Sequence, residues 1–276
     1  MLKIDSHQHF WVYEPVRDSW INDEMAILQD DFLPAHLQPI LEHYGFQGSV
    51  VVQSDQSREE TLFQLDNADK YPFVKGVVGW VDLLAPDLTA QLQDYKKYDK
   101  LKGFRLILQA EQPEYIMRPD LKSGIQKLAD FGYTYDILVY GHQLEAARKM
   151  VSGIEDVPFV LDHIGKPDIT KLPTAQWKQE ITSLASQQNV HCKVSGMVTE
   201  ADVKNWKTED FKPFLDHIFE SFGAQRVMFG SDWPVCRLAA TYGQVLGIME
   251  HYMSSFSKNE QDLFWGDNAA QFYGLS

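Results

Sequence analysis

The strongest constraint on the fold is an alternation of short runs rich in β-branched and aromatic residues with longer stretches of helical periodicity. Eight such runs predict strands at residues 3–10, 48–53, 75–82, 102–108, 133–139, 158–164, 190–196 and 226–232. Amphipathic stretches at residues 59–70, 121–131, 143–152, 177–187 and 211–222 predict helices between them. Strands that alternate with helices are typical of a parallel sheet.

Eight strand–helix repeats favour an α/β fold of the (β/α)8 TIM-barrel type. The alternative is an open, doubly wound sheet, but no G-x-G-x-x-G motif follows the first predicted strand. The 276 residues contain no low-complexity or linker-like segment. We therefore expect one barrel domain over residues 1–276, with its chemistry at the carboxyl ends of the strands.

The charge of the chain limits its partners. A net charge of −14 repels phosphate backbones and anionic lipids, so we expect neither nucleic acid nor a membrane surface as a partner. No apolar stretch is long enough to span a bilayer and no signal peptide is evident, which predicts a cytoplasmic protein. Cys192 and Cys236 form no C-x-x-C pair and are expected to be buried thiols. A homo-oligomer stays possible, because the sequence does not reveal oligomeric state.

The first predicted strand ends in an H-x-H pair, His7 and His9. Alternation places Asp5, His7 and His9 on one face, where the imidazoles are about 7 Å apart along the strand and can converge on one metal ion or one substrate oxygen. Asp5 would orient them from below. The alternative is that two histidines lie near each other by chance or cap the strand.

Two further predicted strands end in polar side chains, which are unfavourable in a packed apolar core. His163 ends the sixth, and Asp232 ends the eighth. Taken alone, His163 could be a hydrogen-bonded core histidine and Asp232 could cap a turn. In a barrel, however, these residues and the H-x-H pair would surround one point above the axis. We interpret the four together as a candidate catalytic site.

Additional polar and aromatic residues belong to this candidate site. Arg105 is expected to point inward and to stabilise an oxyanion, or alternatively to form a salt bridge with Asp136 on the neighbouring strand. Lys193 shares a face with His191 and Ser195; it would contact substrate or extend to the rim. The remaining candidate substrate-binding residues are Lys166, Asp136, Trp11, Trp80 and Trp233, although the tryptophans could equally serve packing.

Several motifs resemble the amidohydrolase superfamily, in particular the amidohydrolase-2 group that contains sugar-acid lactonases. They are DSHQHFW, DFLP from Asp31, GVVGWVDL from Gly76, LKGFR from Leu101, DHIGKPD from Asp162, HCKVSG from His191, FGSDWPVC from Phe229 and NAAQFYG from Asn268. The resemblance covers nearly the whole chain and is greatest to L-fuconolactonase-like and L-rhamnonolactonase-like enzymes. It implies hydrolysis of a sugar lactone to the free acid.

The same resemblance exposes a departure at the metal site. Binuclear members have a bridging Lys or Glu after the fourth strand and a His after the fifth, where this chain has Arg105 and Asp136. A binuclear zinc centre is therefore not expected. The resembling lactonases imply chemistry without an obligatory metal, although His7, His9, His163 and Asp232 could bind a single zinc ion.

The predicted mechanism assigns Asp232 as the general base for water. His7, His9 and His163 would stabilise the oxyanion, with His163 or Arg105 as the main donor, and Lys166 and Lys193 would bind substrate hydroxyls or the product carboxylate. Three alternatives stay open: a lactone isomerase, a metal-dependent decarboxylase, and a sugar-acid binding protein without catalytic activity.

Overall fold

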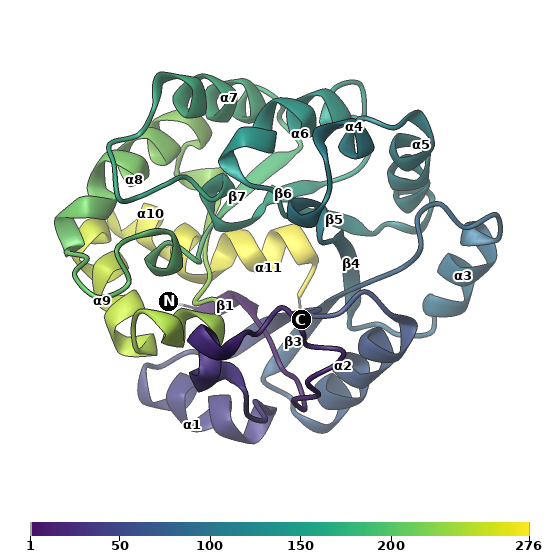
Figure 1. Ribbon diagram of the computed structural model, residues 1–276, viewed down its shortest axis with the longest axis horizontal. Coiled ribbons are helices and arrows are strands. Elements are labelled where there is room, and N and C mark those ends of the chain that lie inside the picture. Colours follow the sequence, from purple (N-terminus) through teal and green to yellow (C-terminus); the bar gives the residue numbers. More distant parts are fainter. Residues whose placement is uncertain (1, 276) are drawn as a thin grey trace.

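A computed structural model describes residues 2–275 and contains the predicted eight-stranded barrel (Figure 1). Neighbouring strands are parallel and follow sequence order from β1 to β8. The strands are β1 (Ile4–Gln8), β2 (Gly48–Val52), β3 (Val74–Gly79), β4 (Leu101–Leu106), β5 (Thr134–Ile137), β6 (Phe159–Leu161), β7 (Val190–Val194) and β8 (Val227–Phe229). Each begins within one residue of its predicted start. The expected fold class is therefore confirmed.

The barrel closes through the segment that follows β8. The Ser6 hydroxyl donates to the carbonyl of Phe229 at 2.6 Å, and the Asp232 amide donates to the carbonyl of His7 at 2.8 Å. His9 N donates to the carbonyl of Trp233 at 2.7 Å. Two of these hydrogen bonds involve residues 232 and 233. Asp232 is therefore held beside the H-x-H pair by backbone hydrogen bonds.

Helices surround the barrel, and five of them match the predicted stretches (Figure 1). These are α2 (Arg58–Lys70), α5 (Pro119–Lys127), α6 (Leu144–Val151), α7 (Ala175–Ala185) and α8 (Thr208–Phe222). The sequence analysis missed α1 (Pro34–His43), α3 (Leu88–Tyr95), α4 (Pro113–Ile116), α9 (Tyr242–Met253), α10 (Lys258–Asp262) and α11 (Asn268–Tyr273). None of the helices that the structure describes is long and apolar enough to cross a membrane.

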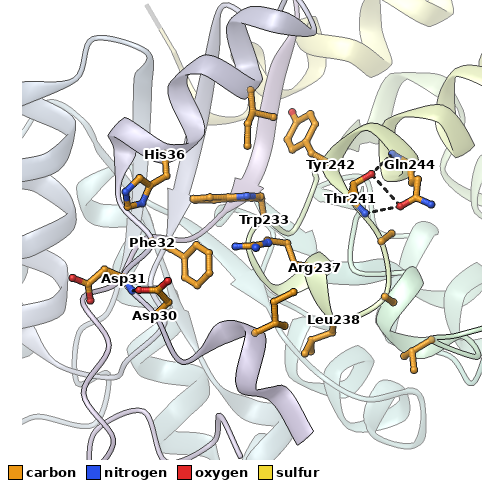
Figure 2. A pocket seen from close by; sticks show the side chains of 15 residues that line it. Asp30, Asp31, Phe32, His36, Trp233, Arg237, Leu238, Thr241, Tyr242 and Gln244 are labelled. Atoms are coloured by element: carbon orange, nitrogen blue, oxygen red, sulfur yellow. Dashed lines mark hydrogen bonds between the residues drawn. The ribbon is translucent and has the colours of Figure 1, made fainter. Parts of the chain in front are cut away.

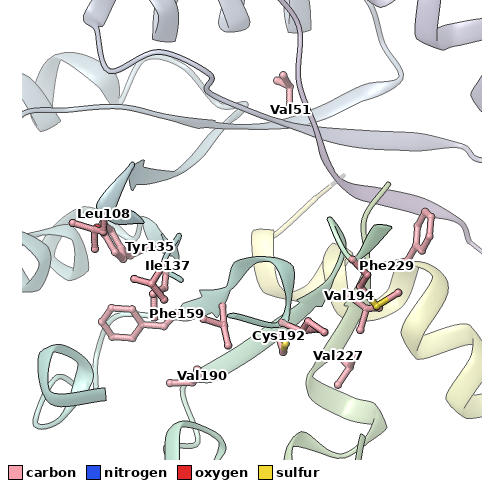
Figure 3. Packing of buried hydrophobic residues seen from close by; sticks show 14 of the residues in the cluster. Val51, Leu108, Tyr135, Ile137, Phe159, Val190, Cys192, Val194, Val227 and Phe229 are labelled. Carbon is pink, nitrogen blue, oxygen red and sulfur yellow. The ribbon is translucent and has the colours of Figure 1, made fainter. Parts of the chain in front are cut away.

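Two hydrophobic cores follow from the alternation of side chains along the strands. Residues such as Phe159, Cys192 and Phe229 point outward and pack under the helices (Figure 3). Intervening residues, including Val160 and Met228, fill the barrel interior, where Ala269 and Tyr273 of α11 also pack. The C-terminal helix therefore supplies part of the inner core. Cys192 and Cys236 are free and buried, as predicted.

Candidate active site

A cavity of about 250 Å³ lies beyond the carboxyl ends of the strands. Its polar residues follow β1, β2, β4, β6 and β8, which is where a barrel of this type places chemistry. One part of its wall is polar and another is apolar. The lining residues are His9, Trp11, Trp20, Ser54, Arg105, Ile107, Gln109, Ala110, Leu138, His163, Lys166, Asp232 and Val235.

His7, His9 and Asp232 converge beside this cavity, and we call these three residues the open cluster. The Nε2 atoms of the two histidines are 3.2 Å apart, and Oδ1 of Asp232 is 3.3 Å from His9 Nε2 and 3.9 Å from His7 Nε2. His9 Nδ1 lies 2.7 Å from the carbonyl oxygen of Val52, which can only accept, so the proton is on Nδ1. Nε2 of His9 therefore presents a lone pair to the open cluster.

Unusual backbone conformations position several site residues. Among residues 2–275, the non-glycine residues with positive φ are His163, Ile164, Lys166 and Asp232, with φ between 44° and 57°. Side chains disfavour this left-handed region, so each such residue carries a conformational cost. Three of the four line the cavity. The strain therefore coincides with the candidate site, as is common for functional residues.

His163 packs against a glycine that admits no side chain. Its Nδ1 lies 2.9 Å from the Ser195 hydroxyl. A Cβ atom on Gly196 would lie 2.5 Å from His163 Nδ1 and 3.2 Å from Asp232 Oδ2, and Gly196 itself has a φ of +59°. Gly196 follows β7 and thus lets the imidazole after β6 and the carboxylate after β8 approach each other across it.

Burial and neighbouring charges set the protonation of the site. Burial raises the pKa of Asp232, but the electrostatic influence of His163 and of the nearby His9 and His7 outweighs it and holds that pKa below its ordinary value. Burial lowers the pKa of His163 to about 4, against the opposing effect of Asp232. At neutral pH the site therefore contains an ionised carboxylate and a neutral imidazole.

A layer of buried ion pairs lies around His7, and we call Arg105, Asp136, Asp162 and Lys193 the charge layer. Arg105 Nη1 donates to Asp162 at 3.1 Å, and Nη2 donates to the carbonyl of Gln53 at 2.5 Å. Lys193 Nζ lies 2.5 Å from Asp136 and 3.2 Å from Asp162. The alternative pairing of Arg105 with Asp136 is therefore wrong, because Asp136 forms its ion pair with Lys193.

The orienting role predicted for Asp5 is also wrong. Its carboxylate accepts from the Ser231 amide at 2.9 Å, from the Ser231 hydroxyl at 2.6 Å and from the Tyr242 hydroxyl at 3.3 Å, and it bonds neither imidazole ring. The cause is a register shift in β1 between Asp5 and Gln8, which interrupts the simple alternation. Asp5 instead fixes the loop that carries Asp232.

The predicted substrate-binding residues divide between the cavity and its surroundings. Trp11 and Lys166 line the cavity, whereas Lys193 and Asp136 are fully buried and, like Trp80, are not among its lining residues. Trp233 faces a separate, larger groove of about 790 Å³, where Arg237 lies over the ring of Phe32 (Figure 2). The structure thus places only part of the predicted set where a ligand could contact it.

Sequence reasoning missed Asp162, Trp20 and Gln109. Alternation after Val160 could have revealed Asp162, because it is the next inward position of the sixth strand. Trp20 contacts Trp11 edge to face with 5.9 Å between ring centroids, and it lies in a loop without periodicity. Gln109 likewise follows β4 in an irregular turn, so no pattern marked either residue.

The donor set of the open cluster fits one divalent cation. Two imidazole nitrogens and one carboxylate oxygen face one another, and these are ligands that zinc accepts. A second group, His7, Asp162 and His163, also has ligand spacing, but Arg105 and Lys193 already neutralise Asp162. The geometry therefore favours one ion over two, with His163 outside the compact ligand group.

Comparisons with known proteins agree with this architecture. A family model described as amidohydrolase matches residues 4–275. An L-fucono-1,5-lactonase of Burkholderia multivorans is 37% identical, with 99% of this chain and 96% of that protein covered. A crystal structure of a B. multivorans amidohydrolase with bound zinc is 38% identical and covers both chains completely, with a TM-score of 0.95. An L-rhamnono-gamma-lactonase of Scheffersomyces stipitis is 24% identical over 52% of this chain and 48% of its own length.

The zinc in that relative argues against a site that never binds metal. Of the four residues predicted to bind a single zinc ion, His7, His9 and Asp232 lie within ligand distance of one another, whereas His163 lies outside this group. The motif-based assignment to a family is confirmed, because the match spans almost all of the described residues. The chain belongs to the amidohydrolase family.

Proposed function

We propose that this protein hydrolyses a sugar-acid lactone to the free acid, with Asp232 as the general base. The names of the relatives support the substrate class. The observation that carries the role of Asp232 is its position: of the cavity-lining residues in the described chain, it is the only carboxylate. It faces the side chains of Arg105, His163 and Lys166, which can donate hydrogen bonds.

This arrangement suits attack of water on an ester carbonyl. Asp232 orients a water molecule and accepts one of its protons as the new carbon–oxygen bond forms. Arg105 and His163 donate to the carbonyl oxygen as negative charge develops there. The ring carbon–oxygen bond then breaks, and the proton held by Asp232 passes to the departing alkoxide. Water is consumed and no oxidant or reductant is needed.

We further propose that the open cluster binds one divalent ion. Such an ion, when bound, lowers the pKa of water and polarises an oxygen ligand. His7 and His9 would hold it through Nε2, and Asp232 through Oδ1. Because Arg105, His163 and Lys166 offer donors of their own, we expect part of the activity to persist without the ion.

The cavity wall indicates how a sugar ring would lie. Trp11 and Trp20 form one side; Trp20 is exposed and its ring face suits the C–H surface of a sugar, whereas Trp11 is almost fully buried. Lys166 lies at another side, where its ammonium is 3.6 Å from Glu200 and can also reach a substrate hydroxyl. We propose that these residues hold the lactone with its carbonyl toward Asp232.

A panel of aldono-1,4- and aldono-1,5-lactones tests the proposal. We expect acid release with at least one of them, and one atom of labelled oxygen from water in the acid. Tight binding without turnover would indicate a binding protein. Rearrangement of the lactone without label would indicate an isomerase, and release of carbon dioxide from a carboxylated substrate would indicate a decarboxylase.

The general base is tested by Asp232→Asn, which retains the shape and removes the proton acceptor. We expect kcat to fall by about 10²- to 10⁴-fold. Asp94→Asn, at an exposed carboxylate on α3, is the matched control and should leave kcat unchanged. An Asp232→Asn variant that retains more than about a tenth of kcat would contradict the assignment.

A further inference from the structure

Lys166 belongs to the walls of two neighbouring pockets. It lines the cavity of about 250 Å³ that contains Asp232, and it also lines a second pocket of about 440 Å³ together with Tyr140 and Glu200. Of these two pockets, Glu200 lines only the second. The mechanism proposed above gives Glu200 no task, although its carboxylate is the ion-pair partner of a cavity residue.

The Lys166 side chain is held by a charge and by an aromatic ring. Its Nζ lies 3.6 Å from Oε1 of Glu200 and 5.2 Å from the centroid of the Tyr140 ring. The side chains of Lys166 and Glu200 are only 15% and 19% exposed, so water screens this pair less than it screens a surface pair. The Ile169 amide donates to the carbonyl of Glu200 at 2.9 Å, which ties the turn after β6 to the turn after β7.

Both side-chain cations of the cavity wall have a carboxylate partner outside the cavity. Arg105 Nη1 donates to Asp162 at 3.1 Å, and Lys166 pairs with Glu200. Neither Asp162 nor Glu200 lines the cavity, whereas Asp232 does. The wall therefore presents hydrogen-bond donors whose positive charges are balanced from behind.

The proposed reaction changes the charge of the ligand. A lactone is neutral, whereas its hydrolysis by water yields a carboxylate and a proton at neutral pH. An unbalanced ammonium in a small cavity would attract this carboxylate much more strongly than it attracts the lactone. Because product release limits many enzymes, retention of the anionic acid would slow turnover.

We propose that Glu200 is a positioning residue that balances the charge of Lys166, so that the site binds a neutral lactone without retaining the anionic acid. Glu200 acts through Lys166, because it does not itself line the cavity. The inference rests on the proposed function in one respect, which is that a neutral substrate becomes an anionic product. It concerns the relative affinity for the two ligands and not the bond-breaking step.

The direct test is calorimetry with two unreactive probes of the same carbon skeleton, sodium L-fuconate and the neutral 1,5-anhydro-L-fucitol. Burial raises the pKa of the Glu200 carboxyl, although the Lys166 ammonium opposes this rise, so binding is measured at pH 8. In Glu200→Gln the affinity for fuconate should rise by about three- to tenfold, and that for anhydrofucitol should change by less than about twofold. An unchanged fuconate affinity, or a loss of affinity for both probes as in a structural role, would overturn the proposal.

A double variant tests whether Glu200 acts through Lys166. In a Lys166→Met background, Glu200→Gln should change the fuconate affinity by less than about twofold, because no ammonium is released. An equal gain in both backgrounds would refute the route through Lys166. Glu200→Asp retains a carboxylate and should bind fuconate like the wild type, so a gain equal to that of Glu200→Gln would show that charge is not the cause. Glu145→Gln, at an exposed carboxylate paired with Lys149 on α6, is the matched control and should change neither affinity.

Product inhibition gives a kinetic readout of the same effect. With the lactone that the protein hydrolyses best, Glu200→Gln should lower the inhibition constant of the corresponding acid by about three- to tenfold and leave KM within about twofold. Normal turnover with an unchanged inhibition constant would refute this inference alone. The expected change in fuconate affinity without hydrolysis of any lactone would refute the proposed function alone, and binding of neither probe to either protein would overturn the inference as well.

Discussion

Replacing Arg105 by Met is expected to reduce both stability and turnover, because this side chain has two roles. It lines the cavity, and it also pairs with the fully buried Asp162. Removing one partner of a buried ion pair costs about 3–5 kcal/mol when the other charge is left alone. Asp162 keeps Lys193 at 3.2 Å, so we expect a loss of about 2–3 kcal/mol in the free energy of unfolding.

That loss converts to a measurable change in Tm. A chain of 276 residues has an unfolding entropy of about 0.6 kcal/mol/K near its midpoint, so Tm should fall by about 3–5 °C. Calorimetry measures this change, and initial rates on a lactone substrate should show a fall in kcat of about 10²-fold. Arg118→Met is the matched control, because Arg118 forms an exposed pair with Asp120 and should shift Tm by about 1 °C at most.

A second substitution separates the two roles of Arg105. Asp162→Asn in the Arg105→Met background removes the carboxylate that lost its partner, so it should recover most of the lost stability while kcat stays low. Recovery of neither property would refute the proposed origin of the instability. A near-normal kcat in Arg105→Met, with the expected fall in Tm, would show that Arg105 does not stabilise the oxyanion and would leave this task to His163.

Three further predictions address the glycine, the metal and pH. Gly196→Ala should lower both Tm and kcat, because the added Cβ would lie 2.5 Å from His163 Nδ1 at a φ of +59°; unchanged values would contradict the close packing. Metal analysis should find at most one zinc per chain, and chelation should leave substantial lactonase activity, whereas complete loss that zinc restores would show that the ion is obligatory. Burial lowers the pKa of His191 to about 4, so the unfolded chain binds protons more readily between pH 6.5 and 4 and the folded state loses stability as the pH falls through that range. His191→Gln should therefore make the decrease of Tm below pH 6.5 less steep, whereas His251→Gln, at an exposed histidine, should not. Equal slopes in the two variants would refute the assignment.

The strand pattern predicted the barrel well because each strand is buried on both faces and reads as a compact apolar run. Val50, Val51 and Val52 are all fully buried, so both faces of this strand carry apolar residues and the apolar run is uninterrupted. The missed helices carry weaker signals: Pro39 lies inside α1, and α11 has only six residues. A proline within a helix and a very short helix both escape a search for 3.6-residue periodicity.

The candidate site was predictable only where side chains follow strands. His9, His163 and Asp232 were found because polar residues ended apolar runs. Arg105 was assigned the wrong alternative partner because periodicity gives the face of a strand but not which of several inward carboxylates lies within reach. Arg105 and Asp136 are in fact register partners on β4 and β5, but Asp136 pairs across the barrel interior with Lys193 of β7, and Arg105 pairs with Asp162.

The same geometry explains how the site tolerates strained backbone. The turn after β6 has left-handed conformations at His163, Ile164 and Lys166, each costing on the order of 1–2 kcal/mol. This turn is held from outside: the Trp177 indole in α7 donates to the carbonyl of Ile164 at 3.2 Å, and Ile164 itself is fully buried. Burial of the Ile164 side chain and this hydrogen bond oppose the strain. The helix layer therefore stabilises the conformation that directs His163 and Lys166 into the cavity, which links the outer core to the chemistry at the barrel mouth.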